Sequence, residues 1–564
     1  MSDPADLLIT GGRVFTAYGP RDLSPYGSDI GPRPIGAPNA IAVRDGRIAW
    51  IGRDAEAMRD WRGPATEHVD ARGGLITAGF DDAHLHLVGG ANEADRVDLF
   101  QLPTVESIQS AIARHAAADP GAPWVLGRGW LYGPFPGGLP TRDLLDSVVP
   151  DRPAFMGCYD GHTGWVNTAA LRAAGIDRET PDPPHGIIVR DPVTGEATGV
   201  LKESAQDLVQ RHIPTPTTED TLAAMRRTIA AMHVTGITAI QDAWVEPDEL
   251  PLWRALRDEG ALRLRARVAL PMKPEGTLDA WGATLDEYEA LIGDLRGGEW
   301  LDAGILKAFA DGVIEARTAA MLEPYTDDAS TGNPEWDAET LDAFVAKADG
   351  RGWQMEIHAI GDGAIRMVLD SYERAATANP TLDRDRRHRV EHVETITRQD
   401  IPRFRALGVV ASMQPYHADP SPNQIDLWAG NIGPERAGQA WSWASIRREG
   451  GVVALGSDWP VVPFDPFIAL NAAVNRQTTA GLPPGGWLPS EKLSLPDALS
   501  AYGHGSAFAA FAETRRGTLR QGADADIVVL DRDILAGGPS SIIGTTVALT
   551  VIGGQVVHRS EALP

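Results

Sequence analysis

The sequence predicts an α/β protein organised around a parallel, TIM-like (β/α)8 barrel. Eight short apolar segments of β character follow one another between residues 75 and 456, and helix-length stretches separate most of them. Repeated alternation of strands and helices is typical of a parallel sheet, and eight repeats can close it into a barrel. Short alternating strands at both ends of the chain predict an additional β layer.

The barrel elements can be placed from hydrophobic periodicity. Stretches with apolar residues at helical spacing lie between the strands, for example at residues 221–234, 338–349 and 363–377. The predicted strands are 75–79, 237–241, 264–270, 304–309, 354–358, 389–392, 409–413 and 452–456.

Both chain ends contain short alternating runs joined by Gly-rich turns, in residues 6–53 and 517–559. Neither end is long enough to bury a sheet alone, so we expect residues 1–74 and 512–564 to form one composite β-sandwich. The barrel then comprises residues 75–91 and 213–511. Residues 92–212 are too many for one crossover, and we interpret them as an insertion after the first barrel strand that shapes the active-site pocket.

The 564 residues carry 51 Lys and Arg against 77 Asp and Glu, a formal net charge of −26. An acidic balance of this kind argues against nucleic acid or an anionic membrane as a partner. No apolar run approaches the roughly 18 residues of a membrane span and no signal peptide is visible, so we expect a cytoplasmic protein. Cys158 is the only cysteine, which excludes an intrachain disulfide and predicts a buried thiol.

Two histidines one residue apart, His84 and His86, are the strongest chemical signal in the chain. Residues i and i+2 of an extended segment point to the same side, so both imidazoles can reach one ion. Further polar residues lie in or at the end of predicted strands, and the carboxyl ends of barrel strands meet at one mouth. These candidates are Lys307, His358, His392 and Asp458.

Imidazole and carboxylate ligands without a thiolate suit Zn²⁺, and also Fe, Mn or Co. Lys307 is the anomaly, because a cationic amine beside two divalent ions is repelled. Reaction of the amine with CO₂ removes the charge and gives a carbamate, whose two oxygens can bridge two metals. The residue pattern therefore predicts a binuclear metal site with an N-carboxylated lysine.

The motifs GFDDAHLHL, LKAFADGV, EIHAIGD, RVEHVE and GSDWPV together resemble those of the amidohydrolase superfamily, in its formamide-deformylase or YtcJ-like branch (amidohydrolase family 3). YDGHTGWVNTAAL, TGVLKESA and GTLRQGADADIVVLD extend the resemblance over nearly the whole chain. It implies a barrel with a flanking β-sandwich and two zinc ions. Carried over by residue, one ion is held by His84, His86, Lys307 and Asp458 and the other by Lys307, His358 and His392.

Such a site is suited to hydrolysis of a C–N bond in an amide, an N-substituted formamide or a cyclic amide. Two divalent ions lower the pKa of a bridging water into the neutral range, so that a hydroxide can attack a polarised carbonyl. Asp458 is the predicted general acid/base. The same site could also act on an ester or lactone or serve a deaminase or decarboxylase, and a non-catalytic regulator on this scaffold is a further alternative.

Several nearby polar residues have two interpretations. Asp81 and Asp82 either orient a histidine or form the turn before it, and Asp311 and Asp362 present the same choice between a turn and a supporting role. His388 is an alternative ligand to His392, but its Arg-rich neighbours favour exposure to solvent.

The substrate pocket is predicted from aromatic and basic residues near the expected mouth. His162 and His417 are candidate catalytic residues, because an imidazole can bind an oxyanion or a carboxylate. We expect a small, apolar or aromatic amide as the partner, and a homodimer is compatible with the sequence. The candidate substrate-binding residues are Arg128, Trp130, Tyr159, His162, Trp165, His417 and Trp459.

Overall fold

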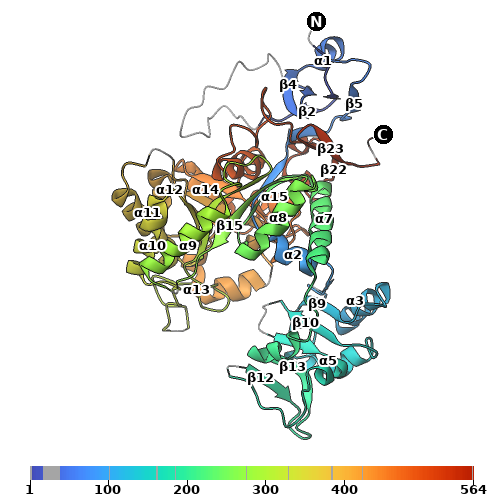
Figure 1. Ribbon diagram of the computed structural model, residues 1–564, viewed down its shortest axis with the longest axis vertical. Helices are drawn as coiled ribbons and strands as arrows, with labels where there is room; N and C mark the ends of the chain where they lie inside the picture. Colours follow the sequence, from blue (N-terminus) through green and yellow to red (C-terminus); the bar gives the residue numbers. More distant parts are fainter. Residues whose placement is uncertain are drawn as a thin grey trace. The chain divides into compact units, whose positions relative to one another are not determined.

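The computed structural model describes residues 3–16, 38–100, 102–159, 163–184, 186–274, 276–327, 329–382, 385–421, 423–561 and 563. The chain divides into two compact units, one made of Met1–Gly90 with Met225–Pro564 and the other of Ala91–Ala224. The first unit contains a barrel and a β-sandwich (Figure 1). The second contains the whole of residues 92–212, the predicted insertion.

An eight-stranded parallel sheet forms the barrel, and each strand pairs with the next one in the barrel order. Its two edge strands meet where the backbone N–H of Asp458 donates to the carbonyl of His84 at 2.6 Å. The predicted TIM-like fold class is thereby confirmed. The barrel strands are β7 (Phe80–Leu85), β14 (Ile237–Asp242), β15 (Arg265–Pro271), β16 (Leu301–Phe309), β17 (Gln354–Ala359), β18 (Arg389–His392), β19 (Val410–Met413) and β20 (Val452–Leu455).

The first predicted barrel strand is wrong. Residues Leu75–Ala78 form β6, which pairs with β2 (Arg13–Val14) and β21 (Ile527–Leu530) in the sandwich. The first barrel strand is β7, which begins at Phe80 directly after Gly79. The apolar run belongs to β6, whereas β7 has the sequence FDDAHL and is buried in spite of its polar residues, so hydrophobic periodicity did not identify β7 as the barrel strand. As a result, His84 lies within a barrel strand rather than beyond it.

Two sheets built from both chain ends form the predicted β-sandwich, and both termini lie beside it (Figure 1). One sheet has the order β4-β3-β1-β5 and the other β2-β6-β21-β22-β23. Side chains from both sheets share one hydrophobic core, which includes Ile41, Val43, Ile527 and Val529. The other elements here are β1 (Leu7–Thr10), β3 (Ala40–Arg44), β4 (Arg47–Gly52), α1 (Asp54–Asp60), β5 (Glu67–Asp70), α18 (Ile534–Gly537), β22 (Val547–Ile552) and β23 (Gln555–Arg559).

The second unit has its own six-stranded sheet, in the order β12-β13-β11-β10-β9-β8. Cys158 is buried at the end of β10, and its thiol donates to the carbonyl of Trp130 at 3.3 Å, which confirms the predicted buried thiol. The elements of this unit are β8 (Val97–Asp98), α3 (Val105–Ala118), β9 (Val125–Trp130), α4 (Arg142–Asp146), β10 (Ala154–Cys158), β11 (Thr163–Val166), α5 (Thr168–Ala173), β12 (Gly186–Arg190), β13 (Ala197–Glu203) and α6 (Asp207–Gln210).

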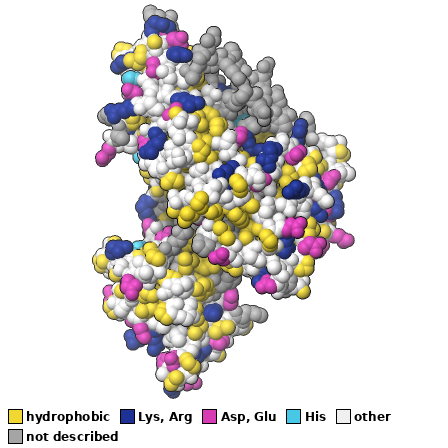
Figure 2. All heavy atoms as spheres, turned by 180° about the vertical axis from the view of Figure 1, so that it is seen from behind, with side chains coloured by type: hydrophobic (Ala, Val, Ile, Leu, Met, Phe, Trp, Pro, Cys, Tyr) yellow, Lys and Arg dark blue, Asp and Glu magenta, His cyan; other side chains and the backbone are white. Residues whose placement is uncertain are grey.

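Helices connect the barrel strands, as parallel pairing requires. The three helices predicted from periodicity are confirmed as α7, α10 and α11. Among the described residues, no helix is both long and apolar enough to cross a membrane. Acidic and basic side chains are interspersed over the face shown in Figure 2. The remaining helices and these three are α2 (Leu87–Ala94), α7 (Thr218–Val234), α8 (Leu250–Asp258), α9 (Leu278–Leu291), α10 (Ala338–Gly350), α11 (Asp362–Ala378), α12 (Ile401–Leu407), α13 (Ala429–Ala437), α14 (Trp443–Arg448), α15 (Pro466–Asn475), α16 (Leu495–Ser500) and α17 (Ser506–Ala509).

Candidate metal centre

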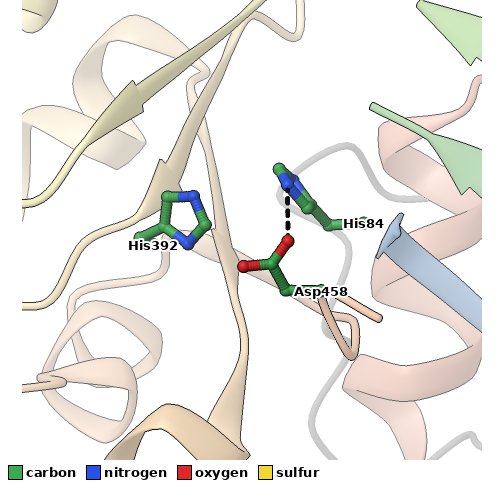
Figure 3. Close-up of side chains that lie close together, drawn as sticks. All are labelled: His84, His392 and Asp458. Carbon is green, nitrogen blue, oxygen red and sulfur yellow. Dashed lines mark ion pairs between the residues drawn. The ribbon is translucent and has the colours of Figure 1, made fainter. Parts of the chain in front are cut away.

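Three of the predicted ligands converge at the carboxyl end of the barrel strands (Figure 3). His84 comes from β7, His392 ends β18 and Asp458 follows β20, and one ligand atom from each lies within 4.8 Å of the others. The Nε2 of His84 is 3.4 Å from Oδ1 of Asp458. All three residues are buried, with at most 6% of their surface exposed.

Two further histidines lie beside these three residues. The Nε2 of His86 is 3.3 Å from Oδ1 of Asp458, and 26% of the His86 side chain is exposed. The ring of His358, on β17, has its centre 4.5 Å from that of His392. The Nε2–H of His358 donates to the carbonyl of Gly312 at 3.0 Å, which leaves Nδ1 as the nitrogen with a lone pair.

Lys307 lies on β16, next to the strand that carries His358, and only 1% of the residue is exposed. Its Nζ is 4.8 Å from the centre of the Phe309 ring, and that ring lies 5.0 Å from the ring of His358. Burial is the largest influence on the Lys307 amine and lowers its pKa. Burial therefore shifts the amine toward its neutral form, which is the form that reacts with CO₂.

The backbone at two of the predicted ligands departs from strand geometry. His392 has a φ of 72° and Asp458 a φ of 66°, in the left-handed region that residues other than glycine rarely adopt. Both residues lie where a barrel strand ends. Strained conformations of this kind cost on the order of 1–3 kcal/mol each and cluster at functional sites. Their occurrence at two ligands supports a functional role for this end of the barrel.

Burial makes the central imidazoles neutral. Desolvation lowers the pKa of His84 to about 4 and that of His358 to about 3, and it lowers the pKa of His392 well below 6.5. Burial raises the pKa of Asp458, but hydrogen bonds from His417 and His86 outweigh it and hold the pKa well below its usual range. Neutral imidazoles beside an ionised carboxylate are the protonation states that a divalent metal requires.

His84 provides a direct test of whether a cation fits. Its Nδ1–H donates to Oε2 of Glu391 at 2.5 Å, so its Nε2 carries a lone pair. In the described part of the chain, that buried Nε2 has no hydrogen-bond partner, and it faces Oδ1 of Asp458 at 3.4 Å. Two lone pairs at this distance repel each other, and a cation between them removes the conflict. The donor set of imidazole nitrogens and carboxylate oxygens suits zinc, iron, manganese or cobalt.

Two other predicted residues border the ligands. The Nε2–H of His417, in the loop after β19, donates to Oδ2 of Asp458 at 3.1 Å, and 18% of its side chain is exposed. The carbonyl of Trp459 accepts the backbone N–H of His86 at 2.8 Å, and its buried ring packs against Gly90. His417 therefore orients the carboxylate, and Trp459 holds the backbone of a predicted ligand, His86.

The other predicted substrate-binding residues belong to the second unit. Trp130 and Trp165 are fully buried in the core of that unit, and their indole N–H groups donate to backbone carbonyls at 2.9 and 2.8 Å. These contacts are typical of core residues. Tyr159 is exposed, and Arg128 lies 3.9 Å from an acidic side chain of the same unit. His162 lies outside the described residues.

The aspartates predicted either to form turns or to support a histidine can be distinguished by their contacts. Asp81 and Asp82 lie in β7 rather than in a turn. Oδ1 of Asp82 accepts the backbone N–H of His84 at 3.2 Å, so this carboxylate supports a ligand. Asp311 and Asp362 accept backbone N–H groups of nearby loops, which is a structural role.

The prediction that His388 is exposed to solvent is wrong, because only 2% of the residue is exposed. Its Nε2 lies 3.2 Å from Oδ1 of Asp349, and its ring stacks on Tyr372 with a distance of 4.7 Å between centres. The neighbouring Arg386 pairs with the same aspartate at 2.9 Å. The neighbouring arginines predicted that His388 is exposed to solvent. The buried carboxylate of Asp349 neutralises part of the positive charge of these arginines instead.

Glu391 and Arg389 were not predicted from the sequence as residues of the site. Both lie on β18 next to His392, and the carboxylate of Glu391 contacts His84 as well as Arg389. A signal was present in their spacing: residues i and i+2 of a strand share a face, and charged residues inside a barrel require charged partners.

The sequence matches the amidohydrolase family over residues 67–558. It is 32% identical over 538 residues to the putative amidohydrolase YtcJ of Bacillus subtilis, covering 93% of this chain and 96% of that protein. It is 28% identical over 515 residues to the N-substituted formamide deformylase of Arthrobacter pascens, covering 88% and 90% respectively. The crystal structure of an uncharacterized metal-dependent hydrolase from Pyrococcus furiosus is 25% identical and superposes with a TM-score of 0.70, over 94% of this chain and 99% of that one. The chain therefore belongs to the amidohydrolase family of metal-dependent hydrolases.

Proposed function

We propose that the protein hydrolyses the C–N bond of a small, apolar or aromatic substrate, which is an amide, an N-substituted formamide or a cyclic amide. The observation that carries this proposal is the convergence of neutral imidazoles on Asp458 at one end of the barrel. The 28% identical relative named as an N-substituted formamide deformylase supports this choice of bond. The partly exposed ring of Phe309 beside His358 supports an apolar substituent on the substrate.

We assign the ligands to two divalent ions, with zinc as the first choice. Lys307 takes part in both groups as an N-carboxylated amine, and its burial and lowered pKa favour the neutral form that reacts with CO₂. A carbamate on Lys307 would supply two oxygens, so this residue could serve as a ligand in both groups. One ion would be held by His84, His86, Lys307 and Asp458, and the other by Lys307, His358 and His392.

A divalent ion at this site supplies Lewis acidity, because it lowers the pKa of a bound water and polarises a carbonyl oxygen. Asp458 is ionised, so it can accept the proton that water loses as it attacks the carbonyl carbon. It then returns this proton to the leaving nitrogen as the C–N bond breaks, which yields a carboxylic acid and an amine. The Nε2–H of His417, 3.1 Å from Oδ2, holds the carboxylate in orientation for both transfers.

Metal analysis and a substrate panel test this function. The purified protein should contain about two divalent ions per chain, and a chelator should abolish hydrolysis until metal is restored. Turnover of N-substituted formamides and cyclic amides should exceed turnover of matched esters and lactones. A metal-free protein with full activity, or one that hydrolyses the esters and none of the amides, would overturn the proposal.

A further inference from the structure

The interior of the barrel beside the ligands contains a buried polar network centred on Arg389. Its guanidinium donates to the carbonyl of Ala83 and to Oε1 of Gln241, both at 2.6 Å, and to Oγ of Ser412 at 3.0 Å. These partners lie on β7, β14 and β19. Arg389 itself is fully buried on β18 and also pairs with Glu356 of β17 at 3.3 Å, so one side chain links five strands of the barrel.

Glu391 connects this network to the metal ligands. Its Oε1 accepts the Nε–H of Arg389 at 2.8 Å, and its Oε2 accepts the Nδ1–H of His84 at 2.5 Å. The side chains of Glu391 and His84 are 0% and 1% exposed, so solvent does not compete for these contacts. Both groups that face the carboxylate are donors, and a carboxylate can accept from both at once.

We propose that Glu391, held by Arg389, is a positioning residue for the metal centre: it fixes the tautomer and ring orientation of His84, so that Nε2 presents its lone pair to the ion. This role rests on the metal site of the proposed function. A histidine that donates its other N–H to a carboxylate is a more basic and better oriented ligand. Loss of such a carboxylate typically lowers metal affinity or activity about 10- to 100-fold.

The rival explanation is that the pair of Glu391 and Arg389 serves folding alone. A buried ion pair is weak evidence for a contribution to stability, so metal affinity and folding have to be measured separately. Asp526 provides a matched control, because its carboxylate is also buried and accepts the Nε–H of Arg265 at 2.6 Å. It directly precedes β21 in the sandwich and contacts none of the predicted ligands.

The test measures the zinc dissociation constant of the full chain by competition with a chromophoric chelator. Glu391→Gln keeps the size of the side chain but replaces one acceptor oxygen with a donor, so at least one of the hydrogen bonds that Glu391 accepts from His84 and Arg389 is lost. We expect the dissociation constant to rise about 10- to 100-fold in Glu391→Gln and to change less than about twofold in Asp526→Asn. The d–d absorption of the cobalt-substituted protein should change in Glu391→Gln and stay unchanged in Asp526→Asn.

Parent-like zinc affinity and an unchanged cobalt spectrum in Glu391→Gln would overturn the positioning role and leave the proposed hydrolysis intact. A parent protein that binds zinc but hydrolyses no amide would overturn the proposed function alone, and a parent that binds no metal would overturn both. If circular dichroism shows that Glu391→Gln is unfolded, Glu391→Asp decides the question. It keeps both acceptor oxygens on a shorter side chain that cannot hold both contacts, so parent-like affinity would contradict the proposal.

Discussion

Gly456 lies at the seam where the barrel closes, and its replacement by alanine tests the geometry of the site. An added Cβ would lie 2.6 Å from the backbone nitrogen of His84 and 2.8 Å from Oδ1 of Asp82. Neither atom can move aside easily, because the N–H of His84 donates to that same oxygen at 3.2 Å and both residues lie in the buried strand β7. The two edges of the barrel must therefore separate in Gly456→Ala.

The size of this separation follows from the distances. Ordinary contact of a Cβ begins at 3.4 Å, so the seam must open by about 3.4 − 2.6 = 0.8 Å. Overpacking of a tight interior costs about 1–3 kcal/mol in the free energy of unfolding. The same movement would carry His84 away from Asp458, whose backbone N–H bonds to the His84 carbonyl at 2.6 Å. We therefore expect weaker zinc binding together with lower stability.

Urea denaturation and chelator competition measure the two effects in Gly456→Ala. Gly430→Ala is the control, because Gly430 lies in α13 and, outside its own helix, no atom of the described residues lies within 4 Å of a Cβ added there. The control should equal the parent or exceed its stability by up to about 1 kcal/mol. A urea midpoint of unfolding and a zinc affinity in Gly456→Ala that both equal those of the parent protein would contradict this prediction. In that case β7 and β20 do not pack at the seam as described.

Three further predictions concern the reaction. Asp458→Asn should reduce kcat by about 10²- to 10⁴-fold with an unchanged far-UV circular dichroism spectrum, because an amide cannot accept the proton; parent-like turnover would remove Asp458 from the acid/base role. Metal-depleted protein should regain more activity on addition of zinc when bicarbonate is present, since Lys307 needs CO₂ to lose its charge, and equal recovery in CO₂-free buffer would contradict the carbamate. Phe309→Ala should raise KM for aryl-substituted amides more than for small alkyl amides, because the ring is 37% exposed beside His358; an equal change for both substrates would exclude Phe309 from substrate contact.

The sequence alone determined the class of fold and the chemistry of the candidate ligands. All but one of the predicted barrel strands, and the three helices placed from periodicity, occur in the structure. The two histidines one residue apart, the lack of a second cysteine and the polar residues at strand ends predicted a site of imidazole and carboxylate donors. These features are local, since an apolar run or the alternation of i and i+2 depends only on nearby residues.

Only the tertiary structure decided which sheet each strand joins and which side chains support the ligands. β6 and β7 are successive buried strands that enter different sheets, although only β6 is an apolar run. Glu391 meets His84 across 307 positions of the chain, and His388 is buried by a partner 39 positions away. Contacts between such distant residues depend on the packing of the whole barrel, and no local pattern of side chains specifies them.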